Sequence, residues 1–377
     1  MRDTVSKATL REFDLIRWIR QEAPADDRVL VGIGDDAAVV RNRDAATLLT
    51  TDLLVEGVHF DLGKASLADV GWKAMARNIS DIAAMGGRSS VAVMSAALPR
   101  GFSEEQAREL VRGALACAAE FDVRLVGGDV SSTQGPLVLS VALLGDTAGR
   151  PPVLRSGARP GDAILVTGTL GGSILGKHLR FRPRQAEGIL LGERYSPHAM
   201  IDISDGFARD LHHILEESGV GARVWASQIP ISDEARRAAR ESGRAPLDHA
   251  LGDGEDYELL FTLDEADAAR LLADRPFDVP VTRVGSVATR GPLVATPEPR
   301  RASAHRSRDR QGAVPRRTGR SVTVAARITT SEPRPSGSGS RSVTVAARTG
   351  PLAATAALVL PDGTEKPLEP EGWEHTA

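Results

Sequence analysis

The sequence predicts an α/β or α+β fold, because strand-like apolar runs alternate with helical segments along most of its 377 residues. In the first part, we expect a helix at 12–20 and strands at 28–34, 46–55, 90–98 and 136–145. A helix at 67–85 and another at 103–121 lie between these strands. The helix at 67–85 is the clearest, since its apolar residues follow the 3.6-residue period: Trp72, Met75, Ala76, Ile79, Ile82 and Ala83.

A second set of elements follows a loop at 155–162 that is rich in turn-forming residues. We expect a strand at 163–168, a helix after the glycine-rich stretch 168–173, a strand at 199–204, a helix at 206–219 and a strand at 258–263. The pattern predicts one domain at 1–148 and a second at 149–295 plus 351–377.

Residues 296–350 interrupt this pattern with a segment that is rich in Arg, Ser, Pro and Gly. The octapeptide RSVTVAAR occurs twice, at 320–327 and 341–348. We interpret the segment as a low-complexity insertion and expect it to be disordered. Its twelve arginines stand against three acidic residues, so a nucleic-acid-binding arm is an alternative. That alternative is less favoured, because the repeat carries neither aromatic residues nor a known motif.

The totals exclude several classes of protein. The single cysteine, Cys117, rules out internal disulfides and cysteine-based zinc sites. No apolar run approaches the roughly 20 residues that span a membrane, and the charged N-terminal stretch lacks an apolar signal core. We expect a cytoplasmic protein.

Acidic residues recur at strand ends and beside glycines. Asp35 and Asp36 interrupt the apolar stretch GIGDDAAVV, and alone they are typical of a surface turn. The same pattern returns in TTDLLVEGVHF, NISDIAAMGG, VGGDVSS, IDISDG and GDGEDYEL. Individual alternatives exist, since Ser204 or Asp205 could cap the next helix and Asp129 could end a strand in a turn. Such repetition nevertheless indicates a carboxylate cluster.

Clustered carboxylates need bound cations. Two of them about 4 Å apart repel by roughly 4 kcal/mol at an effective dielectric constant near 20. Carboxylate and hydroxyl oxygens suit Mg²⁺, which commonly bridges to substrate phosphates. The chain has no P-loop and no protein-kinase motifs. The stretch GTLGGS at 168–173 is either a phosphate-binding loop or, more simply, a tight turn.

In their order, these motifs resemble those of the thiamine-monophosphate kinases, a family of the AIR synthetase-like ATP-dependent superfamily. The resemblance covers about residues 10–295. It implies a two-domain fold whose N-terminal domain forms a β-barrel across a homodimer and whose C-terminal domain is α/β. It also implies Mg²⁺-dependent phosphoryl transfer from ATP to thiamine phosphate, with several Mg²⁺ ions. Neither a membrane nor a nucleic acid is expected as a partner.

The resemblance assigns roles residue by residue. The implied metal ligands are Asp36, Thr50, Thr51, Asp52, Asp81, Asp129, Asp202 and Asp205. Implied ATP contacts are Gly128, Asp129, Arg155 and Ser204. The thiamine phosphate would face His59, Glu255 and Trp373, although a purely structural role for His59 is equally open. No catalytic acid or base is implied.

Alternatives in other classes remain. A related enzyme of the superfamily could use the same ATP site with a different acceptor. A non-catalytic Mg²⁺-nucleotide-binding protein would keep the acids and lack turnover. The arginine-rich segment would add salt-sensitive nucleic-acid binding if it were a functional arm.

Overall fold

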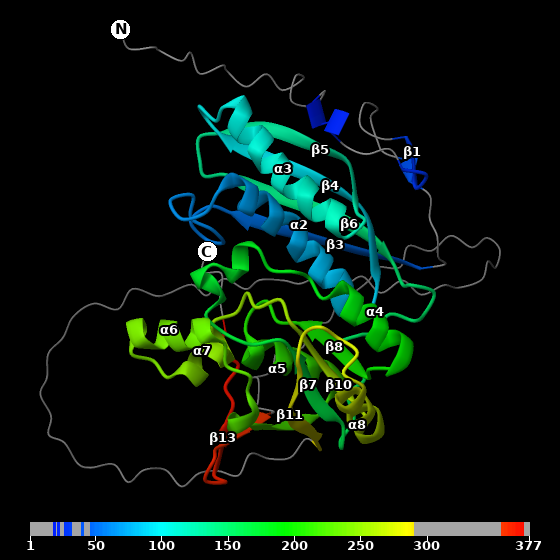
Figure 1. Cartoon of the computed structure of the whole chain (residues 1–377), viewed down its shortest axis with the longest axis vertical. Helices are drawn as coiled ribbons and strands as arrows, with labels where there is room; N and C mark the ends of the chain where they lie inside the picture. Colours follow the sequence, from blue (N-terminus) through cyan, green and yellow to red (C-terminus); the bar gives the residue numbers. More distant parts are fainter. Residues whose placement is uncertain are drawn as a thin grey trace, which may run out of the picture. The chain divides into compact units, whose positions relative to one another are not determined.

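The predicted strands and helices of the first part pair into one four-stranded sheet with two helices on it (Figure 1). The structure is a computed structural model, and it describes residues 18–19, 21–22, 26–31, 39–40, 46–289 and 356–372. All of these residues belong to one compact unit. The segment 296–350, most of the predicted helix at 12–20 and part of the predicted strand at 28–34 lie outside the described residues.

The four-stranded sheet has the order β3-β6-β4-β5, with β3 and β5 at its edges. Only β4 and β5 run parallel, and the other neighbours are antiparallel. The strands predicted at 46–55, 90–98 and 136–145 and the helices predicted at 67–85 and 103–121 are confirmed, and the bounds are β3 (Thr47–Val55), α2 (Leu67–Ala84), β4 (Arg88–Pro99), α3 (Glu104–Glu120), β5 (Arg124–Thr133) and β6 (Val138–Asp146). A separate two-stranded sheet pairs β1 (Val29–Val31) with β2 (Val39–Val40).

Helices α2 and α3 pack closely on one face of this sheet. The side chain of Ser66 caps α2 by accepting a hydrogen bond from a backbone N–H of its first turn. The helices meet at two glycines, since a Cβ added to Gly71 would lie 1.9 Å from the carbonyl oxygen of Leu110. A Cβ on Gly113 would lie 1.9 Å from the carbonyl oxygen of Ala68. Any larger residue would push the helices apart.

On the opposite face of the four-stranded sheet, several described apolar side chains are exposed. Leu49 is 71% exposed and Leu53 is 53% exposed on β3, and Val93 on β4 is 38% exposed. Exposed apolar side chains on two strands of one sheet face, β3 and β4 with β6 between them, are unusual for a solvent-facing surface. The sheet itself stays open, so the described strands of one chain do not close a barrel.

The second part of the chain forms a seven-stranded mixed sheet of order β13-β12-β9-β11-β7-β10-β8. Helix α5 packs on one face, while α4 and α8 pack on the other. The strands are β7 (Ala163–Thr167), β8 (Ala199–Asp202), β9 (Gly221–Trp225), β10 (Leu259–Leu263), β11 (Val281–Ala288), β12 (Ala356–Val359) and β13 (Glu365–Pro367). The helices are α4 (Gln185–Arg194), α5 (Phe207–Ser218), α6 (Asp233–Ser242), α7 (Pro246–Gly252) and α8 (Glu265–Asp274). This is a mixed α/β architecture, as predicted.

One predicted element of this part is wrong. Instead of a helix after 168–173, the chain makes two short 3₁₀ turns, η1 (Ser173–Leu175) and η2 (Lys177–Leu179), and a third, η3 (Ala226–Gln228), follows β9. Gly176, at φ 136°, separates the first two turns, and this backbone conformation cannot continue a helix. Within the described ranges, no helix has both the length and the apolar character needed to cross a membrane.

Candidate active site

One face of α2 carries polar side chains that reach other elements. These side chains are at positions 73, 77, 80 and 81, the spacing that places residues on one side of a helix. The apolar residues predicted from the 3.6-residue period are buried on the remaining faces. Helix α2 therefore packs through its apolar faces and offers a polar stripe to β3 and to the second part of the chain.

Strand β3 meets this stripe with alternate residues. The Thr50 hydroxyl donates to Asp81 Oδ2 at 2.5 Å, and Arg77 Nη2 lies 3.2 Å from Asp52 Oδ1. Because neighbouring strand residues point to opposite faces, Thr51 points away, and its hydroxyl donates to the carbonyl oxygen of Val141 at 3.0 Å. The structure thus brings the side chains of Thr50, Asp52 and Asp81 together and directs that of Thr51 to the opposite face of the sheet.

Asp202 joins this group from the second part of the chain. It is the last residue of β8 and is only 3% exposed. Its carboxylate accepts a hydrogen bond of 2.6 Å from the hydroxyl of Ser80 on α2. Asp81 and Asp202 therefore belong to one cluster, although they are 121 residues apart in the sequence. We call this group the carboxylate cluster: Asp52, Asp81 and Asp202.

Electrostatics shows that the carboxylate cluster is short of positive charge. Burial and the neighbouring carboxylates Asp202 and Asp52 raise the pKa of Asp81. Burial also raises the pKa of Asp202, while the Ser80 hydrogen bond and the charge of Arg155 act in the opposite direction. Buried acids with raised pKa values favour either protonation or a bound cation. The carboxylate and hydroxyl oxygens fit a hard cation such as Mg²⁺.

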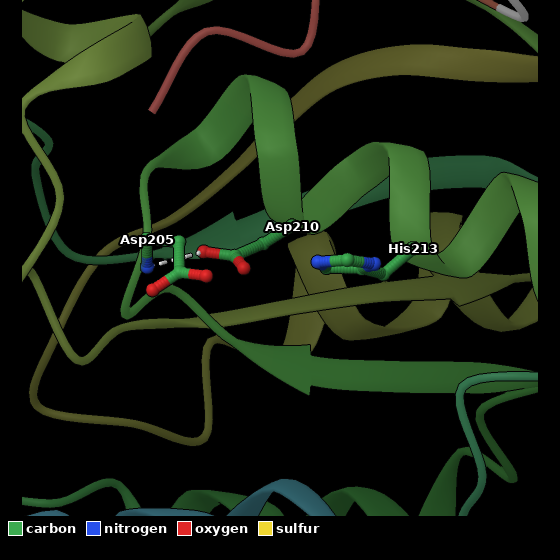
Figure 2. Close-up of side chains that lie close together, drawn as sticks. All are labelled: Asp205, Asp210 and His213. Atoms are coloured by element: carbon green, nitrogen blue, oxygen red, sulfur yellow. Dashed lines mark hydrogen bonds between the residues drawn. The ribbon is translucent and has the colours of Figure 1, made fainter. Parts of the chain in front are cut away.

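A second group of possible metal ligands lies at the start of α5 (Figure 2). Ligand atoms of Asp205, Asp210 and His213 all lie within 4.8 Å of one another. The alternative that Ser204 or Asp205 caps α5 does not hold, because the N-cap residue is Gly206 and no described side chain caps the helix. Asp210 Oδ2 accepts the backbone N–H groups of Asp205 and Gly206 at 3.0 and 3.1 Å. Burial and the charge of Arg155 lower the pKa of His213, which favours the neutral, metal-binding form of the ring.

The loop before β10 brings Glu255 to the end of α2. Glu255 and Tyr257 have φ values of 55° and 51°, in a left-handed region that is uncommon outside glycine. Backbone hydrogen bonds from their N–H groups to the carbonyl oxygens of Ser204 (2.7 Å) and Ile203 (2.8 Å) hold this conformation. The carboxylate of Glu255 in this loop forms an ion pair with Lys73 of α2. The loop is therefore fixed to the segment that carries Asp202 and Asp205.

The glycine-rich stretch at 168–173 is a tight turn whose amides are already in use. Gly171 N–H donates to Asp256 at 2.9 Å, and Gly172 N–H donates to Asp253 at 3.1 Å. The hydroxyl of Ser173 also donates to Asp256. The structure favours the tight-turn interpretation over a phosphate-binding loop.

The remaining predicted residues lie apart from the carboxylate cluster. Asp129 was predicted to end its strand, but it lies inside β5, opposite Ser95. Three inter-strand spacings separate β5 from β3, roughly 14 Å. Gly128 is required where it lies, since a Cβ there would sit 1.9 Å from the Met94 carbonyl oxygen. Within one chain, Asp129 cannot share a cation with Asp52.

His59 is buried, and its ring has a structural contact. Its Nδ1 accepts the backbone N–H of Val55 at 3.0 Å, and its carbonyl oxygen accepts a hydrogen bond from Lys73. Asp36 and Trp373 lie outside the described residues, so their predicted roles stay predictions.

Comparison with known proteins identifies the family. Residues 34–147 match the family described as AIR synthase related protein, N-terminal domain. The chain is 44% identical over 287 residues to a thiamine-monophosphate kinase of Rhodopirellula baltica, an alignment covering 74% of this chain and 90% of that protein. The chain belongs to the thiamine-monophosphate kinase family.

Solved structures of the family share the fold. The thiamine-monophosphate kinase of Stenotrophomonas maltophilia K279a is 36% identical, with a TM-score of 0.63 over 73% of this chain and 92% of that chain. A structure described as AaThiL complexed with AMPPCP and TMP is 32% identical, with a TM-score of 0.59 over 75% of this chain and 94% of that chain. The resemblance seen in the sequence motifs is confirmed.

Sequence reasoning missed several polar residues of this family member's site. Each of these residues contacts a predicted site residue that lies in a different element or turn. They are Lys73, Arg77, Ser80, His178 and Asp210. A signal for three of them was present, because positions 73, 77, 80 and 81 form a polar stripe opposite the apolar period. No comparable signal exists for His178, whose contacts depend on the tertiary fold.

Proposed function

We propose that this chain transfers the γ-phosphoryl group of ATP to thiamine phosphate, giving thiamine diphosphate and ADP. The observation that carries the proposal is the 44% identity to a thiamine-monophosphate kinase together with an intact carboxylate cluster. The relative described as a complex with AMPPCP and TMP supports ATP and thiamine phosphate as the two ligands.

The reaction needs no general base. A phosphate oxygen of thiamine phosphate attacks the γ-phosphorus, and the bond between that phosphorus and the ADP oxygen breaks. Because a phosphate monoester has its second pKa near 6, the attacking oxygen is largely ionised at neutral pH. The protein's task is to place two polyanions in line and to neutralise their charge.

Several Mg²⁺ ions would supply that neutralisation. We assign Thr50, Asp52, Asp81 and Asp202 to one set of ligands and Asp205, with Asp36, to others. The raised pKa values of Asp81 and Asp202 support this assignment, since they show buried negative charge without enough compensation. When bound, the ions would offset the charge that the phosphates bring into the site.

The remaining roles follow the family resemblance. Arg155, whose charge acts on Asp202 and His213, would contact the phosphates of ATP. Gly128 and Ser204 would contact the nucleotide through close backbone approach. His59, Glu255 and Trp373 would face thiamine phosphate. The proposed domains are 1–148 and 149–295 plus 351–377, with 296–350 as an insertion.

A homodimer would cover the exposed sheet face. Leu49 and Leu53 on β3 and Val93 on β4 are exposed on one face of the sheet, and within the described ranges neither edge strand, β3 or β5, pairs with a further strand. Two such sheets placed edge to edge would close an eight-stranded barrel with the apolar residues inside. The fold thus supports a dimeric barrel.

The same closure would explain the position of Asp129. If the β5 edge of one copy lies against the β3 edge of the other, Asp129 approaches Thr51 of the second copy, on the strand that also carries Asp52. Both Asp129 and Thr51 belong to the face that the dimer would cover, whereas Asp52 points to the helix side. We therefore propose that Asp129, together with Thr51, serves the active site of the other subunit.

Hybrid dimers test this arrangement. Asp52→Asn and Asp129→Asn chains carrying different affinity tags are co-expressed, and the hybrid dimer is purified. If Asp129 acts across the dimer, one of the two sites is intact, so about half of the wild-type activity is expected. A hybrid no more active than either parent dimer would rule out the shared site.

The activity itself is tested by incubating the full chain with Mg²⁺, ATP and thiamine phosphate and identifying the products. Thiamine diphosphate and ADP in equal amounts are expected. ADP formation only with a different phosphate acceptor would assign the chain to another activity of the superfamily.

A further inference from the structure

Lys73 is a fully buried charged side chain and the first residue of the polar stripe of α2. Its side chain is 0% exposed. Its Nζ contacts Glu255 Oε2, lies 2.8 Å from His178 Nδ1 and lies 2.6 Å from the carbonyl oxygen of His59. An ammonium group has three N–H donors, so each one has a partner.

The three partners come from three separate segments. His59 follows β3, His178 lies in η2, and Glu255 lies in the loop before β10. They are 14, 105 and 182 residues from Lys73 along the chain. One ammonium group therefore holds three distant segments at a single point.

The contacts around Lys73 favour a charged Glu255. Lys73 Nζ lies 2.8 Å and Glu255 Oε2 lies 3.0 Å from His178 Nδ1. Burial alone would raise the pKa of Glu255, but its contacts with His178 and Lys73 lower the pKa to about 2. Glu255 is thus an anion throughout the physiological pH range.

The two oxygens of Glu255 have different surroundings. Oε2 is held by Lys73 and lies 3.0 Å from His178 Nδ1. Among the described residues, Oε1 has a 3.5 Å contact with the Tyr257 hydroxyl, which is too long for a strong hydrogen bond. Lys73 therefore fixes Oε2 of Glu255, while Oε1 can face a different group.

Two of the three partners of Lys73 are the described residues that we assign to thiamine phosphate. We propose that Lys73 is a positioning residue for that substrate, which orients the Glu255 carboxylate and fixes the His59 segment at the same time. This inference rests on the proposed function. Lys73 touches neither of the ATP contacts Ser204 and Arg155, so its effect is specific to one substrate.

Steady-state kinetics of the full chain test the inference. Each substrate is varied while the other and Mg²⁺ are saturating. Lys73→Met is expected to raise KM for thiamine phosphate at least tenfold and to leave KM for ATP within twofold. Lys73→Gln, which keeps hydrogen-bond donors, is expected to recover part of the loss.

Lys177→Met is the matched control. Lys177 lies next to His178 and also pairs with a buried acid, Glu258, at 2.9 Å, but it contacts neither His59 nor Glu255. Loss of a buried ion pair is common to both variants, whereas only Lys73→Met removes the contacts to the substrate segments. Lys177→Met is expected to leave both KM values within twofold.

A double variant distinguishes positioning from general damage. Lys73→Met with Glu255→Gln removes both charges, so no unpaired buried charge remains to prevent folding. If Lys73 acts in part through Glu255, the double variant raises KM for thiamine phosphate by clearly less than the product of the two single effects. Independent multiplication of the two effects overturns the inference.

The remaining outcomes are also decisive. If Lys73→Met raises both KM values equally, the residue has only a structural role. A wild-type chain that forms no thiamine diphosphate overturns the proposed function, and the inference fails with it. A wild-type chain that forms it while Lys73→Met and Lys73→Gln keep normal KM values overturns the inference alone.

Discussion

Asp81→Asn is expected to change stability in opposite directions without and with Mg²⁺. Asp81 accepts a hydrogen bond from Thr50 at 2.5 Å, and the carboxylates of Asp202 and Asp52 raise the pKa of Asp81. Two carboxylates about 7 Å apart repel by about 2 kcal/mol at an effective dielectric constant near 20. An asparagine keeps an oxygen that accepts the Thr50 hydrogen bond and removes this repulsion.

The metal-free variant should therefore be more stable than the wild type by about 1–2 kcal/mol, which corresponds to a Tm increase of roughly 2–8 °C. Mg²⁺ at 100 times its Kd stabilises the wild type by about 2.7 kcal/mol, because it binds only the folded chain. The variant lacks a ligand and should lose most of this gain.

Thermal unfolding of both proteins, in chelator and in a Mg²⁺ titration, measures the two effects. Asp69→Asn is the control, since Asp69 lies on the same helix but bonds to Ser66 and Arg180 outside the carboxylate cluster. It should keep the wild-type Mg²⁺ response. A metal-free Asp81→Asn protein that is less stable than the wild type, with an unchanged Mg²⁺ response, would refute the assignment of the cluster.

Three further predictions concern packing, pH and assembly. Gly71→Ala should destabilise the chain by about 1–3 kcal/mol in urea unfolding, because its Cβ meets the Leu110 carbonyl oxygen. Gly192→Ala, in α4 with no close backbone contact, should be neutral or slightly stabilising. Glu255 has a pKa lowered from 4.5 to about 2, so its ionised form contributes stability above pH 4.5 that is lost as the pH falls towards 2. The difference in urea midpoint between the wild type and Glu255→Gln should therefore shrink over that range, and a constant difference would contradict the pairing. Leu53→Lys should convert a dimer to monomers in light scattering, whereas an unchanged mass would show that this face is not the interface.

The local structure of this chain could be predicted where a periodic pattern was strong. Helix α2 was predicted at 67–85 and observed at Leu67–Ala84, because its buried residues repeat every 3.6 positions. The stretch at 168–173 led to a wrong prediction. Its place between a strand and the following segment suggested that a helix comes directly after it, but Gly176 and the carboxylates of the loop at 253–258 hold the chain in short turns.

The sequence by itself determined which residues were candidates for the site, since acids beside glycines and inside apolar runs stand out without any structure. Only the tertiary structure decided which of them meet. Asp81 and Asp202 come together because β8 ends beside α2, whereas Asp129 lies at the far edge of the sheet from Asp52. Lys73 shows the same limit, because its partners are up to 182 residues away. A residue's type and local pattern depend on its neighbours in the chain, but the distances between side chains depend on strand order and helix packing.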